Sequence, residues 1–392
     1  MEYINYKMDG DHLIIDLMGH IDSANAAAVE KEINETMDRE APAQLTFDAT
    51  DLKYISSAGL RIILRLRKEM KDLKIINVQP EVYEIFDMTG FTEMVDIQKA
   101  YRVISVDGCE VIGQGANGKV YRINDDTIVK VYLNPDSLDD IRRERDLAKK
   151  AFVLGIPTAI SYDIARVSEG YGTVFELLNA KSFAKLIVAE PEKFDYYVDL
   201  YVDLLKKIHS TVVKEGDMPD MKEIAVGWAE FDREYLPEGV GDKLVEMVKA
   251  VPKDNHMLHG DYHVKNVMMQ AGEVLLIDMD TLCVGNPIFE LGSMFNAYKG
   301  FSALDEGVSQ AFLGIPYETA VAIWEKSLAK YVGGNAAKIA DAEKKAEIIG
   351  YMRLLRRIIR RNGLNNERAK KEIDFYISKL VELVSSVDSL SI

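Results

Sequence analysis

The chain has 392 residues, of which 48% are hydrophobic and 29% charged, and its formal net charge is −16. This length exceeds one ordinary hydrophobic core and predicts two or three domains. The acidic balance disfavours contact with nucleic acid or anionic membranes, because phosphates are bound by basic surfaces. No apolar run approaches the roughly 20 residues that cross a bilayer, and no secretory signal is visible. We therefore expect a cytoplasmic protein without nucleic-acid or membrane partners.

Residues 1–105 predict a small α/β domain. Two apolar segments, at 3–8 and 12–19, are separated by Asp-Gly-Asp, which is typical of a β-hairpin. The later predicted elements alternate between helix and strand, and they lie at residues 23–40, 43–50, 57–72, 74–78 and 80–90. Strands that alternate with helices indicate a partly parallel sheet covered by helices.

Residues 106–392 predict a second, bilobal α+β domain, with a β-rich N-terminal lobe to about 180 and a helical C-terminal lobe beyond it. The predicted elements of the first lobe are a glycine-rich pair of strands, a helix and a further strand, at 110–133, 136–155 and 172–178. In the second lobe, two short apolar strands joined by Ala-Gly interrupt the helical pattern around 252–290.

The stretch GQGANGKV places Gly113, Gly115 and Gly118 in the pattern GxGxxG. Both dinucleotide-binding loops and kinase-type loops use this pattern, so it is a weak signal alone. A dinucleotide site needs a helix after the glycines, whereas this sequence predicts a β-hairpin. That order favours a kinase-type flap over phosphates, with Val120 against the base and Lys130 on the returning strand.

A phosphate-binding lysine needs an acidic partner that holds its geometry. Glu144 lies on the helix that follows Lys130 and can reach it. Asp139 and Asp140 lie one turn earlier with shorter side chains, so they are weaker candidates.

The stretch HGDYHVKN and the apolar strand after it supply the polar residues that phosphoryl transfer requires. Asp261 suits a carboxylate that orients the attacking hydroxyl. Asn266 and Asp278 suit magnesium, because hard cations prefer oxygen ligands. His259 is better interpreted as a structural loop residue, and Asp280 either assists the metal or caps a turn.

With these motifs, residues from about 107 onward resemble the aminoglycoside phosphotransferase and choline kinase group, a branch of the protein-kinase-like fold. The resemblance rests on HGDxxxxN and on an Ile-Asp strand end, which this sequence writes as HGDYHVKN and LLIDMD. It implies an ATP- and Mg²⁺-dependent small-molecule kinase. Its implied site consists of the catalytic base Asp261, the magnesium ligands Asn266 and Asp278, the phosphate-binding Lys130, and Glu144 as the partner of that lysine.

Two further stretches carry the same resemblance. VFELL resembles the strand that joins the lobes, which implies that the backbones of Glu176 and Leu178 meet adenine. NPIFELG matches the family's stretch after the metal loop, except that Glu290 stands where aspartate is usual. A pseudokinase without turnover is the alternative, although no expected catalytic residue is missing.

Residues 3 to about 100 resemble a STAS domain of the anti-sigma-factor antagonist type, through LMGHIDSANA and LTFDATDLKYISSAGLRIIL. In that family, a serine or threonine at a helix start is phosphorylated by a partner kinase, and the matching position here is Ser57. A helix N-terminus stabilises added negative charge. Ser56 stands where aspartate is usual, and the alternative is that Ser56 or Ser57 only caps the helix.

The stretch RLLRRIIRR places Arg353, Arg357 and Arg360 on one side of a predicted helix, with Arg356 and Arg361 beside them. A solvated or salt-bridged face is the favoured interpretation, and an anion-binding surface is the alternative.

Together the motifs predict a small-molecule kinase that phosphorylates a hydroxyl, fused to a regulatory STAS domain. The partners expected are the hydroxyl substrate and, through the STAS domain, an anti-sigma-type serine kinase or other regulatory protein. Two rivals remain: a signalling protein in which both domains regulate a partner, and a protein kinase that modifies a STAS serine. The acceptor cannot be derived from any motif in the helical lobe.

Overall fold

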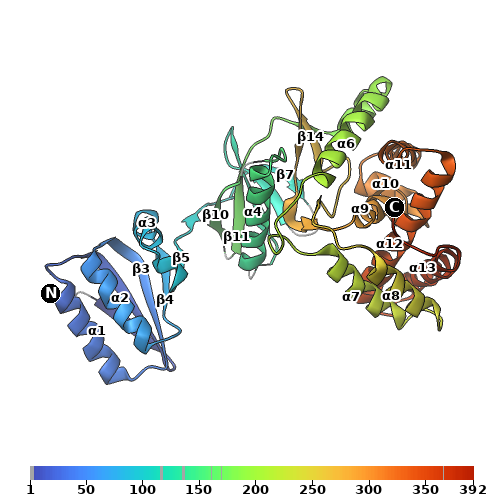
Figure 1. The fold of residues 1–392 in the computed structure, drawn as a ribbon. Coiled ribbons are helices and arrows are strands. Elements are labelled where there is room, and N and C mark those ends of the chain that lie inside the picture. Colours follow the sequence, from blue (N-terminus) through green and yellow to red (C-terminus); the bar gives the residue numbers. More distant parts are fainter. Residues whose placement is uncertain (1–3, 115–117, 135–136, 160, 169, 365) are drawn as a thin grey trace. The chain divides into compact units, whose positions relative to one another are not determined.

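The computed structural model describes residues 4–114, 118–134, 137–159, 161–168, 170–364 and 366–392. The chain divides into two compact units, Met1–Ser105 and Val106–Ile392, and each unit has its own hydrophobic core. Figure 1 shows the first unit in blue and the second from cyan to red. Within the described ranges, no helix has both the length and the hydrophobicity needed to cross a bilayer.

The first unit is a five-stranded sheet with helices packed on it, which agrees with the predicted α/β domain, although the fifth strand, β5, is absent from the sequence-based prediction. Its strands run in the order β1-β2-β3-β4-β5, with β1 antiparallel to β2 and every later neighbour parallel. The strands are β1 (Ile4–Asp9), β2 (His12–Ile21), β3 (Gln44–Ile55), β4 (Lys74–Val78) and β5 (Asp96–Lys99). The helices are α1 (Ala26–Glu40), α2 (Ser57–Glu69), α3 (Pro80–Met88) and the short η1 (Phe91–Glu93).

The core of this unit follows from the alternation of side chains along its strands. Leu13, Ile15 and Leu17 of β2 are buried, whereas the residues between them are partly exposed. Phe47 of β3 and Phe86 of α3 are fully buried in the same core. The parallel strands are connected through helices, which bury their apolar stripes against the sheet.

The N-terminal lobe of the second unit is an antiparallel sheet with the strand order β10-β11-β9-β8-β7. Its elements are β7 (Val111–Gln114), β8 (Gly118–Arg122), β9 (Thr127–Tyr132), α4 (Leu138–Val153), β10 (Ser161–Val167) and β11 (Gly170–Glu176), and the short β6 (Arg102–Val103) precedes the unit. Strand β10 is absent from the sequence-based prediction. An irregularity between Ser161 and Asp163 breaks the two-residue alternation that would reveal a strand.

The C-terminal lobe is helical around a buried helix, α9 (Pro287–Tyr298), in which every residue from Ile288 to Tyr298 is buried. A helix that is apolar on all sides belongs in the middle of a core, and α9 packs on α11 (Tyr317–Val332) and α12 (Ala336–Asn362) (Figure 1). The remaining helices are α5 (Phe183–Ala189), η2 (Pro191–Lys193), α6 (Phe194–His209), α7 (Met221–Arg233), α8 (Val240–Ala250), η3 (Met279–Thr281), η4 (Gly300–Ser302), α10 (Gly307–Phe312) and α13 (Glu367–Ser386).

Two small antiparallel sheets interrupt these helices, and the sequence predicts only the strands β14 and β15 among their members. The strands β14 (Val267–Gln270) and β15 (Glu273–Leu276) pair with each other, and β12 (Lys181–Ser182) pairs with β14. The strands β13 (Met257–Leu258) and β16 (Cys283–Val284) form the second sheet. These strands position the polar loops on either side of β14 and β15.

Because the two units have separate cores, a cavity in one core should leave the other intact. We expect Phe86→Ala to lower the free energy of unfolding of the first unit by about 3–5 kcal/mol, the usual cost of truncating a buried phenylalanine. Calorimetry of the full chain should show one transition shifted to lower temperature. Met88→Ala on the same helix is the control, because Met88 is 80% exposed. Equal shifts of both transitions would contradict separate cores.

Candidate active site

The strand register places three residues of the predicted nucleotide site, together with Thr173, on one face of the sheet in the N-terminal lobe. Gly113 pairs with Val120, Val120 pairs with Lys130, and Lys130 pairs with Thr173. Paired residues of antiparallel strands project to the same side of a sheet, so Lys130 projects from the same face as Val120 of the glycine hairpin. Gly115, the middle glycine of the motif, lies outside the described residues.

Gly118 is required by the close approach of two strands. A Cβ atom at this position would lie 2.4 Å from the carbonyl oxygen of Val131 on β9. At Gly113 an added Cβ would make only ordinary contact, 3.5 Å from Val120. The glycine pattern therefore has a packing reason at Gly118 that is independent of any ligand.

Lys130 joins the sheet to two acidic side chains. Its Nζ lies 2.8 Å from Oε1 of Glu144 on α4 and 2.8 Å from Oδ1 of Asp278, just beyond β15. Burial alone would lower the pKa of Lys130, but the charges of Asp278 and Glu144 outweigh burial and raise it above its ordinary value. The lysine is therefore a fixed positive charge at neutral pH.

Glu144, the partner of Lys130, lies on the buried face of α4. Glu144 shares that face with Ile141 and Leu147, and its second oxygen accepts a hydrogen bond from the Tyr132 hydroxyl. The two weaker candidates instead lie at the exposed start of the helix, where Asp139 pairs with Arg142 and Asp140 with Arg143. Tyr132 was not singled out from the sequence, although it lies two residues after Lys130 and so on the same face of the strand.

The HGD loop depends on one glycine and one buried carboxylate. Gly260 has a φ of +82°, and a Cβ there would lie 2.5 Å from the carbonyl oxygen of Thr281. The fully buried Glu290 of α9 accepts the backbone N–H groups of His259 and Gly260, the latter at 3.0 Å. Glutamate at this position, where the resembling family has aspartate, thus anchors the loop to α9.

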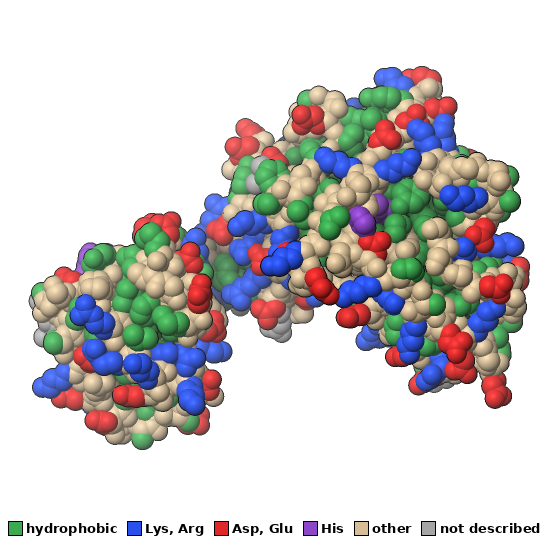
Figure 2. All heavy atoms as spheres, viewed as in Figure 1, with side chains coloured by type: hydrophobic (Ala, Val, Ile, Leu, Met, Phe, Trp, Pro, Cys, Tyr) green, Lys and Arg blue, Asp and Glu red, His purple; other side chains and the backbone are tan. Residues whose placement is uncertain are grey.

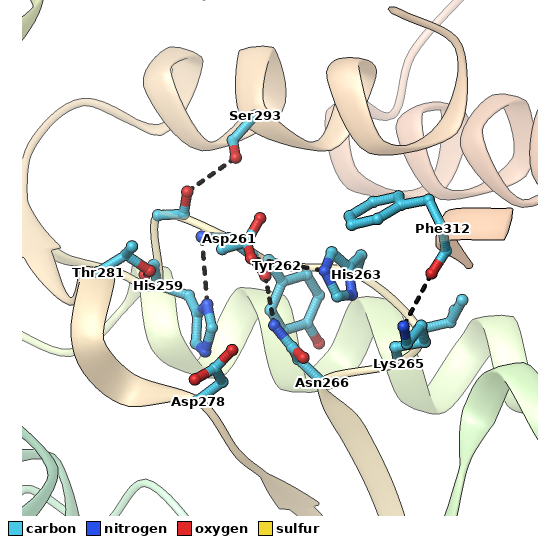
Figure 3. A network of polar contacts seen from close by, with 12 residues as sticks. His259, Asp261, Tyr262, His263, Lys265, Asn266, Asp278, Thr281, Ser293 and Phe312 are labelled. Atoms are coloured by element: carbon cyan, nitrogen blue, oxygen red, sulfur yellow. Dashed lines mark hydrogen bonds and ion pairs between the residues drawn. The ribbon is translucent and has the colours of Figure 1, made fainter. Parts of the chain in front are cut away.

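Figure 3 shows the loop and the polar residues around it. Both ring nitrogens of His259 are engaged with backbone: Nε2 lies 3.2 Å from the carbonyl oxygen of Ile277, and Nδ1 accepts the N–H of Asp261 at 3.2 Å. This arrangement agrees with a structural role for His259. Thr281 adds a hydrogen bond of 2.7 Å from its hydroxyl to the carbonyl oxygen of His259.

Asp261 projects its carboxylate from the loop toward His263, whose Nε2 lies 3.5 Å from Oδ2. Burial alone would raise the pKa of Asp261, but His263 and the charge of Arg353 lower it to about 2. The carboxylate is therefore ionised at neutral pH. It can accept a hydrogen bond from the hydroxyl group of a bound molecule.

Asn266 directly precedes β14, and Asp278 lies two residues beyond the end of β15. The Asn266 side chain donates from Nδ2 to the carbonyl oxygen of Asp261 at 3.0 Å, which turns Oδ1 away from that bond. Asp278 has a φ of +64°, a left-handed conformation at which the chain turns from β15 into η3. The structure thus brings Lys130, Asp278 and the HGD loop into one region.

The side chains of Asn266, Asp278 and Asp280 carry oxygen atoms of the kind that Mg²⁺ prefers. Burial, and then the nearby charge of Asp278, raise the pKa of Asp280 to about 7. Asn266 adds an amide oxygen, and Mg²⁺ commonly takes few protein ligands and completes its shell with phosphates and water. Across the described residues, no group of three or more His, Cys, Asp or Glu side chains forms a metal cluster of its own.

Three buried tyrosines, Tyr201, Tyr262 and Tyr298, form hydrogen bonds that hold the HGD loop. They are absent from the site predicted from the sequence. Tyr262 and Tyr201 of α6 exchange hydrogen bonds between hydroxyl and carbonyl groups at 2.6 and 3.1 Å. The Tyr298 hydroxyl accepts the N–H of Val264 at 3.0 Å and donates to the Tyr201 hydroxyl at 2.9 Å. Because α6, α9 and the loop are distant in sequence, no local pattern reveals this contact.

Arg353 of α12 also contacts the loop. Its Nη1 donates to the carbonyl oxygen of Gly260 at 3.1 Å and to the Ser293 hydroxyl at 2.7 Å. Ser293 donates to the same carbonyl oxygen at 2.8 Å (Figure 3). The arginine face predicted for this helix therefore has at least one member that supports the HGD loop.

The end of β11 presents a backbone carbonyl group on the side away from Asp126. Leu177 donates its N–H to the carbonyl oxygen of Asp126 at 2.7 Å. Because the carbonyl group of one residue and the N–H group of the next point in opposite directions across a trans peptide bond, the carbonyl group of Glu176 points away from Asp126. Glu176 and Leu178 are partly buried.

Comparisons with known proteins identify two families along the chain. Residues 108–324 match the model of the Phosphotransferase enzyme family, and residues 3–103 match that of the STAS domain. The putative anti-sigma factor antagonist BtrV of Bordetella bronchiseptica is 35% identical over 95 residues, which span 23% of this chain and 80% of that protein.

Solved structures also align with the chain. One is a thermostable mutant of an aminoglycoside phosphotransferase in a ternary complex with ADP and hygromycin B, with a TM-score of 0.49, 11% identity, and coverage of 72% of this chain and 94% of that one. Another is a choline/ethanolamine kinase family protein from Mesorhizobium loti, with a TM-score of 0.44, 15% identity, and coverage of 70% and 87%. Both resemblances expected from the sequence are confirmed by the family models: the chain belongs to the Phosphotransferase enzyme family and carries a STAS domain at its N-terminal end.

Proposed function

We propose that the C-terminal unit transfers the γ-phosphoryl group of ATP to a hydroxyl group of a small molecule. The observation that carries this proposal is the position of Lys130, which contacts both Glu144 and Asp278. These contacts join β9, which pairs with strand β8 of the glycine hairpin, to α4 and to the acidic turn after β15. That combination supplies fixed positive charge, metal-binding oxygens and a carboxylate, which are the groups that phosphoryl transfer requires.

Each group has a separate part in the proposed reaction. Lys130 would contact the nucleotide phosphates while Glu144 holds its ammonium in place. Asn266 and Asp278 would hold Mg²⁺, whose charge stabilises the phosphate oxygens when it is bound. Asp261 would orient the acceptor hydroxyl and accept its proton. With a pKa of about 2, Asp261 is a weak base, so proton transfer would accompany bond formation rather than precede it.

The nucleotide would lie against the N-terminal lobe. Val120 would pack against adenine, and the backbone of Glu176 and Leu178 would form hydrogen bonds with the edge of the base. Gly118 and Gly113 belong to the hairpin that would cover the phosphates, together with Gly115 outside the described residues. The position of Val120 on the same face as Lys130 supports this arrangement.

Replacing Asp261 tests the proposed role of its carboxylate. We expect Asp261→Asn to lower acceptor-dependent ADP release by a factor of about 10²–10⁴, because the amide cannot accept the proton, and to leave ATP affinity nearly unchanged. The measurement is ADP release with aminoglycosides, choline, homoserine, sugars and nucleosides. Asp374→Asn, at an exposed position of α13, is the matched control. Full turnover by Asp261→Asn would contradict the assigned role.

Replacing Lys130 tests nucleotide positioning. Lys130→Met leaves Glu144 and Asp278 without their cation, so we expect ATP binding to weaken about tenfold or more, as for the loss of a charged hydrogen bond. Calorimetric titration with ATP and Mg²⁺ measures this change. Lys119→Met is the control, because Lys119 pairs with Val131 and therefore projects from the opposite face of the sheet. Equal ATP affinities for wild type and Lys130→Met would remove Lys130 from the site.

We further propose that the STAS domain regulates the protein through Ser57. The Ser56 side chain caps α2 by accepting the N–H of Ala58 at 3.2 Å. Ser57 is the next residue, the first of the helix, and it is exposed. The cap is thus made by Ser56, and the Ser57 hydroxyl can be reached from solvent. A phosphate at this position would be stabilised by the N-terminal end of the helix.

Labelling with radioactive ATP separates the two serines. We expect an anti-sigma-type serine kinase to label wild type and Ser56→Ala but not Ser57→Ala. Ser56→Ala should instead lower stability by about 0.5–2 kcal/mol through loss of the cap. Label that forms without an added kinase and disappears in Asp261→Asn would identify the chain as its own serine kinase. An unlabelled Ser57 with and without added kinase would contradict the proposed regulation.

A further inference from the structure

A cavity of about 390 Å³ lies in the helical lobe between η4, α12 and the start of α13. Its wall includes Phe301, Arg357, Arg361, Glu372 and Tyr376. This volume is at the small end of the range of ligand pockets, about 300–1,000 Å³. It therefore suits a small metabolite rather than a large one.

The cavity is connected to the HGD loop through a line of aromatic contacts. The ring of His263, beside Asp261, packs edge-on against Phe312 at 5.2 Å between centroids (Figure 3). Phe312 packs against Phe301 at 5.3 Å, and the guanidinium of Arg357 lies 4.9 Å from the centre of the Phe301 ring. These contacts thus link His263 of the loop to Phe301 and Arg357 of the cavity wall.

Helix α12 also links the HGD loop to the cavity, because it contacts both. Arg353 donates a hydrogen bond to Gly260, the residue before Asp261. Arg357 follows four residues later, which is about one turn or 6 Å along a helix, and it lines the cavity. The charge of Asp261 also acts on the pKa of Arg357, which burial and the neighbouring arginines lower. The two residues are therefore within electrostatic range.

Two arginines of the cavity wall are free to bind an anion. On the face shown in Figure 2, basic and acidic side chains are interspersed, as expected for a surface of paired charges. Among the described residues, however, no carboxylate lies within ion-pair distance of Arg357 or Arg361, and both residues are exposed, so of the solvated or salt-bridged face predicted from the sequence these positions show the solvated form. Stacking on Phe301 fixes the Arg357 guanidinium and leaves its N–H groups available.

Asp305 and Glu372 also line the cavity, where they would compete with a bound anion for the arginines, but each has another polar neighbour. Asp305 uses Oδ1 to accept the N–H of Gly307 at 3.0 Å, at the start of α10. Glu372 lies near the Tyr376 hydroxyl, whose pKa burial and then the charge of Glu372 raise to about 12. A guanidinium fork binds carboxylate or phosphate through two parallel hydrogen bonds, and Arg357 and Arg361 supply two such forks.

We infer that this cavity is the acceptor site and that it selects a small hydroxyl compound bearing a carboxylate or phosphate, held by Arg357 and Arg361. The inference rests on the proposed kinase function. The acceptor oxygen would form a bond to the γ-phosphorus of ATP while the bond from that phosphorus to the β,γ-bridging oxygen breaks. ADP leaves with the bridging oxygen, and the hydroxyl proton passes to Asp261.

Matched acceptors test this specificity. Glycerate and glycerol phosphate are compared with glycerol, and homoserine is compared with choline and an aminoglycoside, in an assay of ADP release. We expect the highest kcat/KM for an anionic member. Turnover confined to neutral or cationic acceptors would overturn the anionic assignment and leave the kinase proposal standing. ATP binding without turnover of any acceptor would instead overturn the kinase proposal.

Variants of α12 locate the anion site. Arg357→Gln and Arg361→Gln should raise KM for the anionic acceptor about tenfold or more, with unchanged ATP affinity. Arg357→Lys, which keeps the charge but loses the fork, should give an intermediate KM. Arg360→Gln is the matched control, because Arg360 is exposed on the same helix and does not line the cavity. Equal KM values for wild type, Arg357→Gln and Arg361→Gln would place the acceptor elsewhere.

Discussion

The site depends on the single ammonium group of Lys130, which lies between two carboxylates from opposite lobes. The lysine side chain is 17% exposed and Glu144 only 4%, so this pair is largely removed from water, whereas Asp278 is 41% exposed. Removing one member of a buried ion pair typically costs about 3–5 kcal/mol, because the other charge is left uncompensated. Two carboxylates around one ammonium also leave an excess of negative charge. A bound cation would relieve that excess, which is the physical reason to expect magnesium at this turn.

A second constraint is that the HGD loop is held by contacts that do not involve the carboxylate of Asp261. The HGD loop is fixed almost entirely through its backbone, by Glu290, by the Tyr298 hydroxyl, and by Arg353 with Ser293. The carboxylate of Asp261 is therefore not needed to hold the loop and can face a substrate. Fixed donors and acceptors that need no rearrangement are the main source of electrostatic stabilisation in enzyme sites. Glutamate in place of aspartate at position 290 preserves this arrangement by reaching two adjacent N–H groups.

Local patterns predicted the parts of the site that depend on local geometry. Strand alternation gives the direction of Lys130, and the buried stripe of α4 contains Glu144 but not Asp139 or Asp140. The same alternation could have revealed Tyr132. In contrast, β10 was missed because an irregularity disturbs its period. The tyrosine cluster and the contact of Arg353 were missed because they join segments that meet only in the folded lobe.

The arginines of α12 show why a face cannot be interpreted from its sequence alone. Arg353 and Arg357 are one turn apart and identical in type, yet the first donates to the loop backbone and the second stacks on Phe301 beside a cavity. A rigid helix that carries both contacts would transmit a change at one to the other. An acceptor held by Arg357 would therefore fix α12, and through Arg353 it would fix the loop that presents Asp261. Under the proposed function, acceptor recognition and placement of the base are two consequences of the same helix.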